Sequence, residues 1–248
     1  MVIATRPAPL PAAADPPRRS ANHLLAALPR AEYARLRPHL QVVHRPIHAR
    51  LYAPDEPIAH VYFPLSGIAS MVATMRDGAT VEVGTTGNEG FVGLPALLGV
   101  ASTPFLTLVQ AAGDFARLPL AAFRAACGPA THLHGLLDRY AHALFTLAGQ
   151  SGACNRLHTV GTRCARWLLL THDRLGADTF PLTHEYLGQM LGVRRASVTL
   201  AAGGLARAGL LTYHRGIVTI RDRAGLEAAS CECYGAIRDE FARQLASA

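Results

Sequence analysis

Side chains that can hydrogen-bond to nucleic acid are concentrated in the stretch from Arg194 to Thr199 (Arg-Arg-Ala-Ser-Val-Thr). A guanidinium group can donate two parallel hydrogen bonds to guanine or to a phosphate, and a hydroxyl group can bond to a base or a phosphate. Two adjacent arginines are also common on ordinary solvated helices. The stretch therefore predicts DNA reading only if its neighbours hold it on a rigid, exposed element.

The neighbouring residues predict two short helices joined by a sharp turn. Thr183 is a favourable N-cap for the first helix, and Glu185 in its first turn suits the positive end of the helix dipole. Gly188 is small where a second helix must approach closely, and Gly192 suits a turn that needs positive φ. The second helix is predicted over residues 194–208.

The predicted second helix has an apolar and a polar face. Arg195 and Thr199 lie one turn apart on the polar face, with Arg194 and Ser197 beside them. The stripe expected to be buried consists of Val198, Ala201, Ala202 and Leu205. A rigid helix whose first turns present hydrogen-bond donors is what major-groove reading requires.

Residues 210–220 (Leu-Leu-Thr-Tyr-His-Arg-Gly-Ile-Val-Thr-Ile) predict a hairpin that turns at residues 214–216. The hairpin could be a wing whose Arg215 meets a phosphate, or it could simply cover the helix pair. The candidate DNA-binding residues are thus Thr183, Arg194, Arg195, Ser197, Thr199 and Arg215.

The formal net charge of +7 is unevenly distributed along the chain. Residues 156–221 contain nine arginines and three acidic residues, a net charge of +6, whereas residues 222–248 carry −2. Positive charge concentrated around the predicted helix pair favours a phosphate-bearing partner.

Residues 41–120 contain short apolar runs that alternate with turn residues. Asp77-Gly78, between two alternating runs, is a strong hairpin signal. Regularly spaced short strands with such turns predict a β-sandwich or β-roll. Before them, residues 22–40 predict a helical pair interrupted at Pro29.

A long helix is predicted from about Thr131, and a further helix is predicted to end near Gly176. The apolar positions of the long helix recur at alternating spacings of four and three, which is the heptad pattern of a coiled coil. A single helix packing on its own domain would show the same stripe, and that alternative stays open. The seam predicted to join two copies consists of Leu133, Leu137, Tyr140, Leu144 and Leu147, followed by Ser151 and Cys154.

The chain divides into four segments by composition. Residues 1–21 are rich in proline and alanine and predict a disordered arm without the apolar core of a secretory signal. Residues 22–130 predict a β-roll domain, 131–155 a dimerisation helix and 156–248 a DNA-binding domain. Because no apolar run approaches the ~20 residues that span a bilayer, we expect a cytoplasmic protein with no membrane partner.

The five cysteines are an odd number in a chain without an export signal, so a disulfide framework is not expected. Cys231-Glu232-Cys233 is tighter than the usual spacing of zinc ligands, and the sequence places no further ligands nearby. We therefore predict buried or free thiols, no metal site and no catalytic residue.

Taken together, the segments resemble the Crp/Fnr superfamily of transcription regulators, with the most specific match at Leu-Thr-His-Glu-Tyr-Leu-Gly-Gln-Met-Leu-Gly-Val-Arg-Arg-Ala-Ser-Val (residues 182–198). The resemblance implies an α+β fold with a jelly-roll-like β-roll sensor, a long dimerisation helix and a C-terminal winged helix-turn-helix. It also implies that Thr183 contacts phosphate and that Arg195 reads guanine. The partners it implies are a double-stranded DNA operator, a second copy of the chain and RNA polymerase.

Two departures from the family pattern bear on the operator and the signal. Ala196 and Leu200 replace a base-reading glutamate and an arginine, so we expect a different operator. Family members that bind cyclic nucleotides hold the phosphate with an Arg-Ser/Thr pair, but Ser102-Thr103 has no preceding arginine. We therefore expect an unidentified small-molecule or gas effector other than a cyclic nucleotide.

No cofactor is predicted. The N-terminal cysteine cluster of the family's iron–sulfur sensors is absent, because no cysteine precedes Cys127. Haem stays possible, although lone histidines such as His44, His48 and His60 are more often structural.

Two other functions compete with DNA-dependent regulation. A cupin-like β-roll metalloenzyme with a helical tail would need histidines clustered on strands, but the pair His132 and His134 falls in a helical region. A ligand-binding module could instead use the helix-turn-helix for protein contacts only. A steep salt dependence of DNA binding would distinguish DNA reading from this module, because phosphate contacts release counterions. We predict that the chain is not an enzyme.

Overall fold

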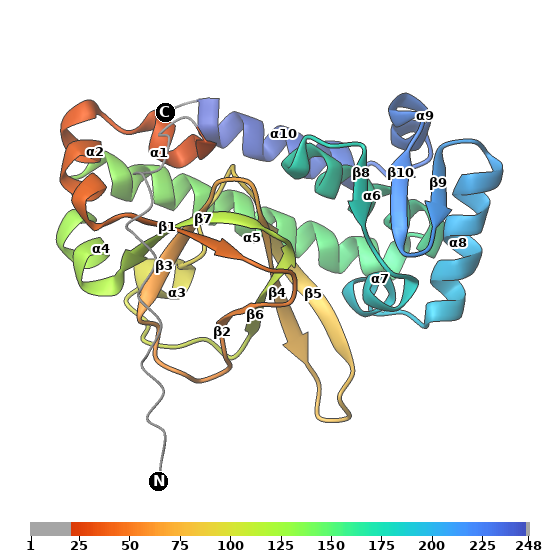
Figure 1. The fold of residues 1–248 in the computed structure, drawn as a ribbon, viewed down its shortest axis with the longest axis horizontal. Coiled ribbons are helices and arrows are strands. Elements are labelled where there is room, and N and C mark those ends of the chain that lie inside the picture. The colour runs from red at the N-terminus through yellow and green to blue at the C-terminus, as the bar shows by residue number, and fades with distance from the viewer. Residues whose placement is uncertain (1–20, 247–248) are drawn as a thin grey trace, which may run out of the picture.

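The computed structural model describes residues 21–246, and nearly all of the predicted N-terminal arm lies outside them. The fold class is α+β, as the sequence predicts. A β-roll stands at one end and a small winged helical domain at the other, joined by the long helix α5 (Figure 1). No helix in this part of the chain is both long and apolar enough to cross a membrane.

The β-roll consists of two antiparallel sheets with strand orders β1-β7-β3 and β2-β6-β4-β5. Phe115, Val109 and Tyr62 are among the apolar side chains that fill the space between them. The Asp77-Gly78 signal marks the β4–β5 hairpin, where Gly78 has a φ of 84°. The strands are β1 (Gln41–Arg45), β2 (Arg50–Tyr52), β3 (His60–Pro64), β4 (Ile68–Thr74), β5 (Thr80–Thr86), β6 (Leu106–Ala111) and β7 (Gly113–Pro119).

Short helices close the end of the roll that lies away from the winged domain (Figure 1). Asn22 caps the first by accepting a hydrogen bond from the Leu25 N–H group at 3.1 Å, and Pro29 separates the first pair as predicted. The helices are α1 (His23–Ala27), α2 (Arg30–Leu36), the 3₁₀ turn η2 (Arg37–His39), α3 (Leu94–Leu97) and α4 (Leu120–Ala126).

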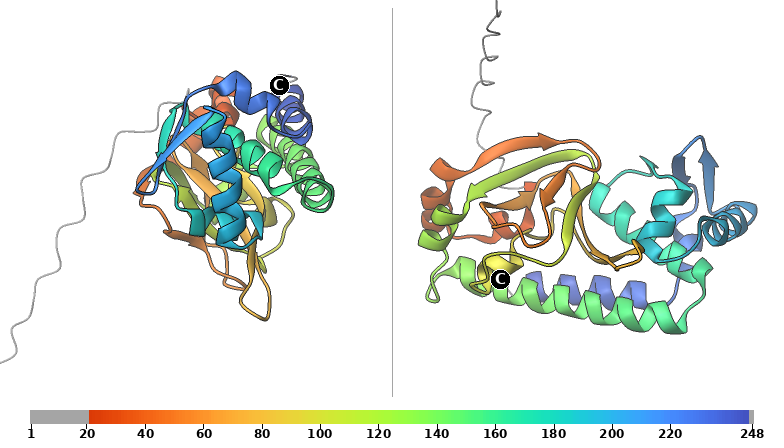
Figure 2. Two further views of the ribbon diagram at one scale, coloured as in Figure 1. Left: turned by 90° about the vertical axis from the view of Figure 1, so that its right-hand side faces the viewer. Right: turned by 90° about the horizontal axis from the view of Figure 1, so that it is seen from below.

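Helix α5 (His132–Leu157) packs against its own roll on one side and against the C-terminal helix α10 (Cys233–Ala246) on another. The two helices run side by side (Figure 2, right). Tyr140 shows the packing: its ring contacts Phe91 and Phe241, and its hydroxyl lies 2.8 Å from Thr86 Oγ1.

The heptad seam on α5 therefore requires a correction. The predicted dimer residues Leu133, Leu137, Tyr140, Leu144 and Leu147 are each at most 4% exposed in the single chain. They face the roll and α10, so intramolecular packing, the second of the two alternatives, explains their spacing. The exposed face of α5 carries Phe145, which is 76% exposed.

The winged domain begins with helix α6 (Val160–Leu175), which ends at Gly176 in the left-handed conformation. A three-stranded sheet of order β8-β10-β9 lies beside the helix pair α7 and α8. Its elements are β8 (Thr179–Pro181), α7 (His184–Leu191), α8 (Arg195–Arg207), β9 (Leu211–His214), β10 (Ile217–Ile220) and α9 (Arg223–Ala228).

Candidate nucleic-acid interface

The sharp turn between α7 and α8 depends on two glycines. Gly192 ends α7 with a φ of 63°, which favours glycine. A Cβ atom on Gly188 would lie 3.0 Å from the carbonyl oxygen of Val193, so a side chain there would push the turn outward. These contacts fix the angle at which α8 leaves α7.

Helix α8 exposes the arginines on which the DNA prediction rests. Arg194 is the N-cap residue and Arg195 the first residue of the helix, and both are exposed. Val198, Ala202 and Leu205 are buried, while Ala201, which was expected in the same stripe, is half-buried. The guanidinium groups thus stand at the N-terminus of a helix anchored by its opposite face.

The three hydroxyl groups of the candidate set have different surroundings. Thr183 Oγ1 accepts a hydrogen bond from the Tyr186 N–H group at 3.1 Å, which leaves its own proton free to donate. Thr199 Oγ1 donates to the Arg195 carbonyl oxygen at 3.1 Å and lies 3.0 Å from His184 Nδ1. Thr199 therefore ties α8 to α7, and only Thr183 and the half-buried Ser197 could donate to DNA without breaking a bond.

The wing turn brings Arg215 to the same face as the start of α7. Arg215 has a φ of 46° and Gly216 a φ of 78°, the pattern of a tight two-residue hairpin. The Gly216 carbonyl oxygen accepts a hydrogen bond from the Leu182 N–H group at 2.7 Å, and the Tyr213 hydroxyl donates to the Leu182 carbonyl. Since Leu182 precedes Thr183, the wing and the N-cap are held together.

The net charge of residues 156–221 overstates the positive charge that DNA phosphates can reach. Arg163, Arg166 and Arg174 are each at most 8% exposed, so three of the nine arginines lie inside the fold. The exposed arginines are Arg156, Arg194, Arg195, Arg207, Arg215 and Arg221. Burial was not visible from the sequence because all nine positions read as surface charge.

The β4–β5 hairpin of the roll lies beside the start of α8. Gly78, Ala79 and Thr80 of the β4–β5 hairpin line a cleft together with Arg194 and Arg195. Strand β5 also packs on α7, and Gly192 lies close to the Val81 side chain. A DNA duplex that reached the first turn of α8 would meet this hairpin as well.

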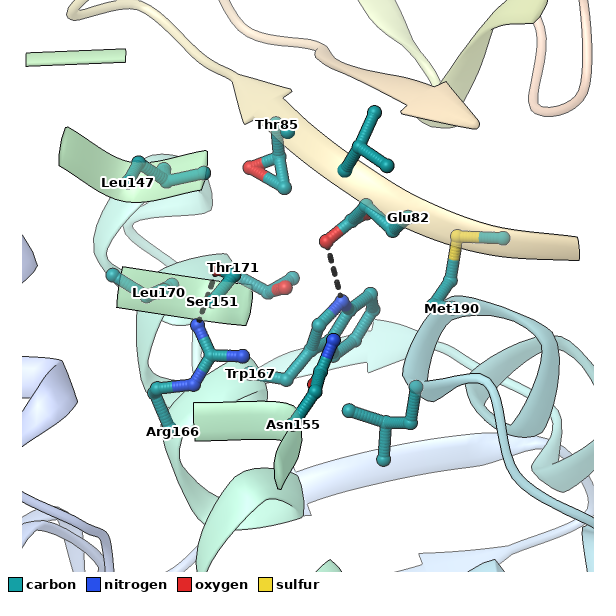
Figure 3. Close-up of a pocket in the computed structure, with 13 residues that line it drawn as sticks. Glu82, Thr85, Leu147, Ser151, Asn155, Arg166, Trp167, Leu170, Thr171 and Met190 are labelled. Atoms are coloured by element: carbon teal, nitrogen blue, oxygen red, sulfur yellow. Dashed lines mark hydrogen bonds between the residues drawn. The ribbon is translucent and has the colours of Figure 1, made fainter. Parts of the chain in front are cut away.

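The joint between roll and winged domain is polar and buried. Glu82 of β5 accepts a hydrogen bond from the Trp167 indole N–H group at 3.0 Å (Figure 3). Burial raises the pKa of Glu82 from 4.5 to about 7, against the lowering effect of its hydrogen bonds to Ser70 and Trp167. Sequence patterns singled out neither residue. The only signal at Glu82 is that it is the single charge in the apolar run Thr-Val-Glu-Val (residues 80–83).

Two further contacts complete the joint. Gln110 of β6 donates to Thr171 Oγ1 at 3.0 Å, and Arg174 forms a buried ion pair with Glu89 at 2.8 Å. Trp167, Thr171 and Arg174 follow at spacings of four and three, so one face of α6 makes all three contacts. We name this face the α6 polar stripe.

The position expected for a cyclic nucleotide is small and uncharged. Its cavity has a volume of about 20 Å³, close to that of a single water position. Tyr52, Thr86, Thr103 and Leu94 are among its lining residues, and no arginine is among them. The described roll therefore offers no cation there for a phosphate.

These features define a β-roll domain joined to a winged helix-turn-helix domain. Two sequence profiles match the chain: the cyclic nucleotide-binding domain over residues 43–128 and the Crp-like helix-turn-helix domain over residues 162–229. The chain belongs to the Crp/Fnr superfamily of transcription regulators. That family consists of regulators rather than enzymes, so the cupin interpretation is set aside. No curated protein matches the sequence.

Solved structures share the fold at low sequence identity. FixK2 from Bradyrhizobium japonicum is 18% identical with a TM-score of 0.66, over 77% of this chain and 98% of that one. A CRP-family transcriptional regulator from Thermus thermophilus is 19% identical with a TM-score of 0.64, over 76% and 96%. The c-di-GMP-responsive regulator CLP from Xanthomonas campestris is 16% identical with a TM-score of 0.58, over 77% and 99%.

The buried Glu82 leads to a pH prediction. A carboxyl whose pKa is higher in the folded than in the unfolded chain contributes stability that is complete below about pH 4.5 and is lost as the pH rises to about 7. Glu82→Gln keeps a neutral, hydrogen-bonding side chain at every pH. We expect the variant to gain stability over the wild type between about pH 5 and about pH 8, by an upper limit of about 3 kcal/mol.

Urea denaturation of both proteins across that pH range measures the difference. The control is Glu56→Gln, which changes the same group at an exposed position and should show no such trend. A stability difference between wild type and Glu82→Gln that stayed constant with pH would contradict the prediction.

Proposed function

We propose that the chain is a sequence-specific DNA-binding regulator that acts as a dimer and reads its operator with α8. Arg195 is the main base-reading residue, supported by Arg194 and Ser197, while Thr183 and Arg215 hold phosphates. The observation that carries the proposal is the pair of exposed arginines at the N-terminus of a helix whose opposite face is buried.

Thr199 has a modified role in the proposal. Because its hydroxyl proton is used by the Arg195 carbonyl, it positions Arg195 rather than contacting bases. Ala196 and Leu200 stand exposed beside Arg195, and Leu200 is 75% exposed. Apolar groups in the major groove contact thymine methyl groups, so the operator should contain thymine next to the guanine that Arg195 reads.

The dimer is proposed to form through the exposed face of α5 instead of its heptad seam. Phe145 is the largest apolar side chain there, and small residues follow it at helical spacing: Ala148, Gly149, Gly152 and Ala153. Small residues let two helices approach closely, and Phe145 supplies apolar area. Two copies joined in this way would present two recognition helices to half-sites about one helical turn apart.

The signal is proposed to be a small molecule or gas other than a cyclic nucleotide. The roll cavity of about 20 Å³ without an arginine supports this choice, because a buried phosphate needs a paired cation. Contact with RNA polymerase is proposed from the family alone.

Arg195→Ala should weaken specific binding by about 1–3 kcal/mol, because a bidentate contact with one base pair is lost. Fluorescence anisotropy at moderate salt measures this loss of binding free energy, with a DNA duplex selected by footprinting the wild-type protein. Arg124→Ala, at an exposed position of α4, removes the same charge far from the interface and should bind normally. If the Arg195→Ala variant bound DNA with wild-type specificity, the assignment of Arg195 as the base-reading residue would be overturned.

Arg215→Gly tests the wing separately, since glycine accepts the positive φ at this position without strain. Loss of one phosphate contact should weaken binding to all duplexes alike and reduce the slope of log K against log salt by about 1. An unchanged salt slope would mean that the wing covers the helix pair without touching DNA.

Phe145→Glu should convert the dimer to a monomer, because it places a charge in the proposed contact between two α5 helices. Sedimentation velocity reports the mass in solution. The control is Leu98→Glu, at a position 66% exposed on the roll, which should leave the mass unchanged. A Phe145→Glu protein that stayed dimeric would place the dimer contact elsewhere.

Cyclic AMP and cyclic GMP should not bind the roll. Isothermal titration with either nucleotide at roughly 1 mM should give no saturable heat. A ligand with a binding free energy as weak as about −4 kcal/mol would still give a measurable signal at that concentration. Saturable binding of either compound would refute this part of the proposal while leaving the DNA interface intact.

A further inference from the structure

Four side chains that bind soft metals meet where α5 turns into α6. Cys154 lies near the end of α5, His158 caps that helix, and Cys231 and Cys233 stand at the start of α10. Their three sulfur atoms and one ring nitrogen all lie within 4.8 Å of one another. The sequence predicts no further ligands near Cys231 and Cys233, and that prediction is wrong because the return of α10 along α5 brings residues about 77 positions apart together.

We propose that Cys154, His158, Cys231 and Cys233 form a tetrahedral site for one soft divalent cation, with Zn²⁺ as the natural occupant. Three thiolates and one imidazole are a donor set that structural zinc uses. The inference concerns this site only and does not depend on the proposed operator or effector.

The spacing of the ligand atoms fits a single ion. Zinc lies about 2.3 Å from sulfur and about 2.0–2.1 Å from nitrogen, so a tetrahedron separates neighbouring ligand atoms by about 3.5–3.8 Å. The Cys154 and Cys231 sulfur atoms are 3.5 Å apart, and Cys233 Sγ is 3.4 Å from His158 Nδ1. The described side chains therefore need only small shifts to close around an ion.

Groups around the four ligands support the same assignment. His158 would bind through Nδ1, and its Nε2 lies 3.3 Å from Glu232 Oε1, which is the carboxylate–histidine pairing common around metal sites. Gln150 Nε2 donates to Cys233 Sγ at 3.1 Å. Cys233 and Cys154 are fully buried, Cys231 is 6% exposed and His158 is half-buried, and the four side chains would fill all four positions of a structural zinc ion.

Two buried arginines beside the four ligands have no negatively charged partner among the described residues. Arg163 and Arg166 are buried beside the cysteines, and among residues 21–246 neither forms an ion pair. Each has a buried Nε atom without a hydrogen-bond partner. A cation that binds three thiolates leaves one net negative charge, which these two guanidinium groups would offset.

The location gives the site a mechanical role. His158 lies two residues before α6, so an ion held there would fix the bend between α5 and α6 and fasten α10 to both. Helix α10 also begins after residue 229, where the match to the Crp-like helix-turn-helix profile ends. Cys154 and His158 lie between the two profile matches, so all four ligands fall outside the segments that the profiles describe.

The first test measures metal on the full chain, purified under reducing conditions without a histidine tag. Elemental analysis should find about one zinc per chain. After exchange, Co²⁺ should give the strong visible bands of a tetrahedral ion together with thiolate-to-cobalt charge transfer in the near ultraviolet. A fully reduced wild-type protein that bound no zinc or cobalt stoichiometrically would overturn the proposal.

Variants test the ligand assignment. Cys231→Ser with Cys233→Ser, and separately His158→Ala, should abolish stoichiometric binding or remove the tetrahedral cobalt spectrum. Cys127→Ser is the matched control, because that sulfur also faces a histidine, His134, at 3.7 Å but lacks further ligands. If the ligand variants bound metal as the wild type does, the site would be refuted.

A change outside the ligand set keeps the test informative if a cysteine variant fails to fold. Glu232→Gln removes only the partner of His158 Nε2 and should weaken zinc by about tenfold in competition with a chelating dye. Unchanged zinc affinity would refute the proposed pairing of Glu232 with His158. Iron with a broad visible absorption, or a Cys154–Cys231 disulfide without metal in freshly purified protein, would likewise overturn the mononuclear site.

Discussion

The α6 polar stripe is the constraint on which the rest of the structure depends. Trp167, Thr171 and Arg174 each reach a different strand or loop of the roll, through Glu82, Gln110 and Glu89. Buried polar groups are costly when unpaired, so the three bonds fix one orientation in which all are satisfied. Since α6 also packs on α7 and α8, that orientation decides where Arg194 and Arg195 point.

The buried carboxyl of Glu82 joins this stripe to a further hydrogen-bonded pair, Ser70 and Gln110. Ser70 Oγ lies 2.7 Å from both Glu82 Oε2 and Gln110 Oε1, but a serine hydroxyl has a single proton to donate. Ser70 donates to Glu82 or to Gln110, and Gln110 in turn donates to Thr171 Oγ1. The hydrogen bonds from Ser70 and Trp167 lower the pKa of Glu82, and burial of the carboxyl outweighs them and raises it to about 7.

Local patterns predicted the elements well, and their long-range contacts poorly. The hairpin at Asp77-Gly78, the caps at Thr183 and Gly192 and the polar face of α8 follow from backbone geometry within a few residues. The seam of α5 was a true apolar stripe, but no local pattern says whether a stripe packs on its own chain or on a partner. Arg174 and the cysteine cluster depend on residues some 80 positions apart, and only the fold brings those together.

The free energy cost of breaking a buried ion pair such as Arg174–Glu89 is comparable with the free energy needed to shift a two-state equilibrium. Moving a two-state equilibrium from 1:99 to 99:1 takes about 5.5 kcal/mol, and breaking a buried ion pair by removing one partner costs about 3–5 kcal/mol. Glu89 belongs to the loop between β5 and Phe91, whose ring contacts Phe63 of β3 and Phe123 of α4. A ligand that displaced this loop would act directly on Arg174. The β4–β5 hairpin beside Arg194 would move with the same sheet. A ligand bound in the roll would thus have a short, contiguous route through these contacts to the first turn of α8.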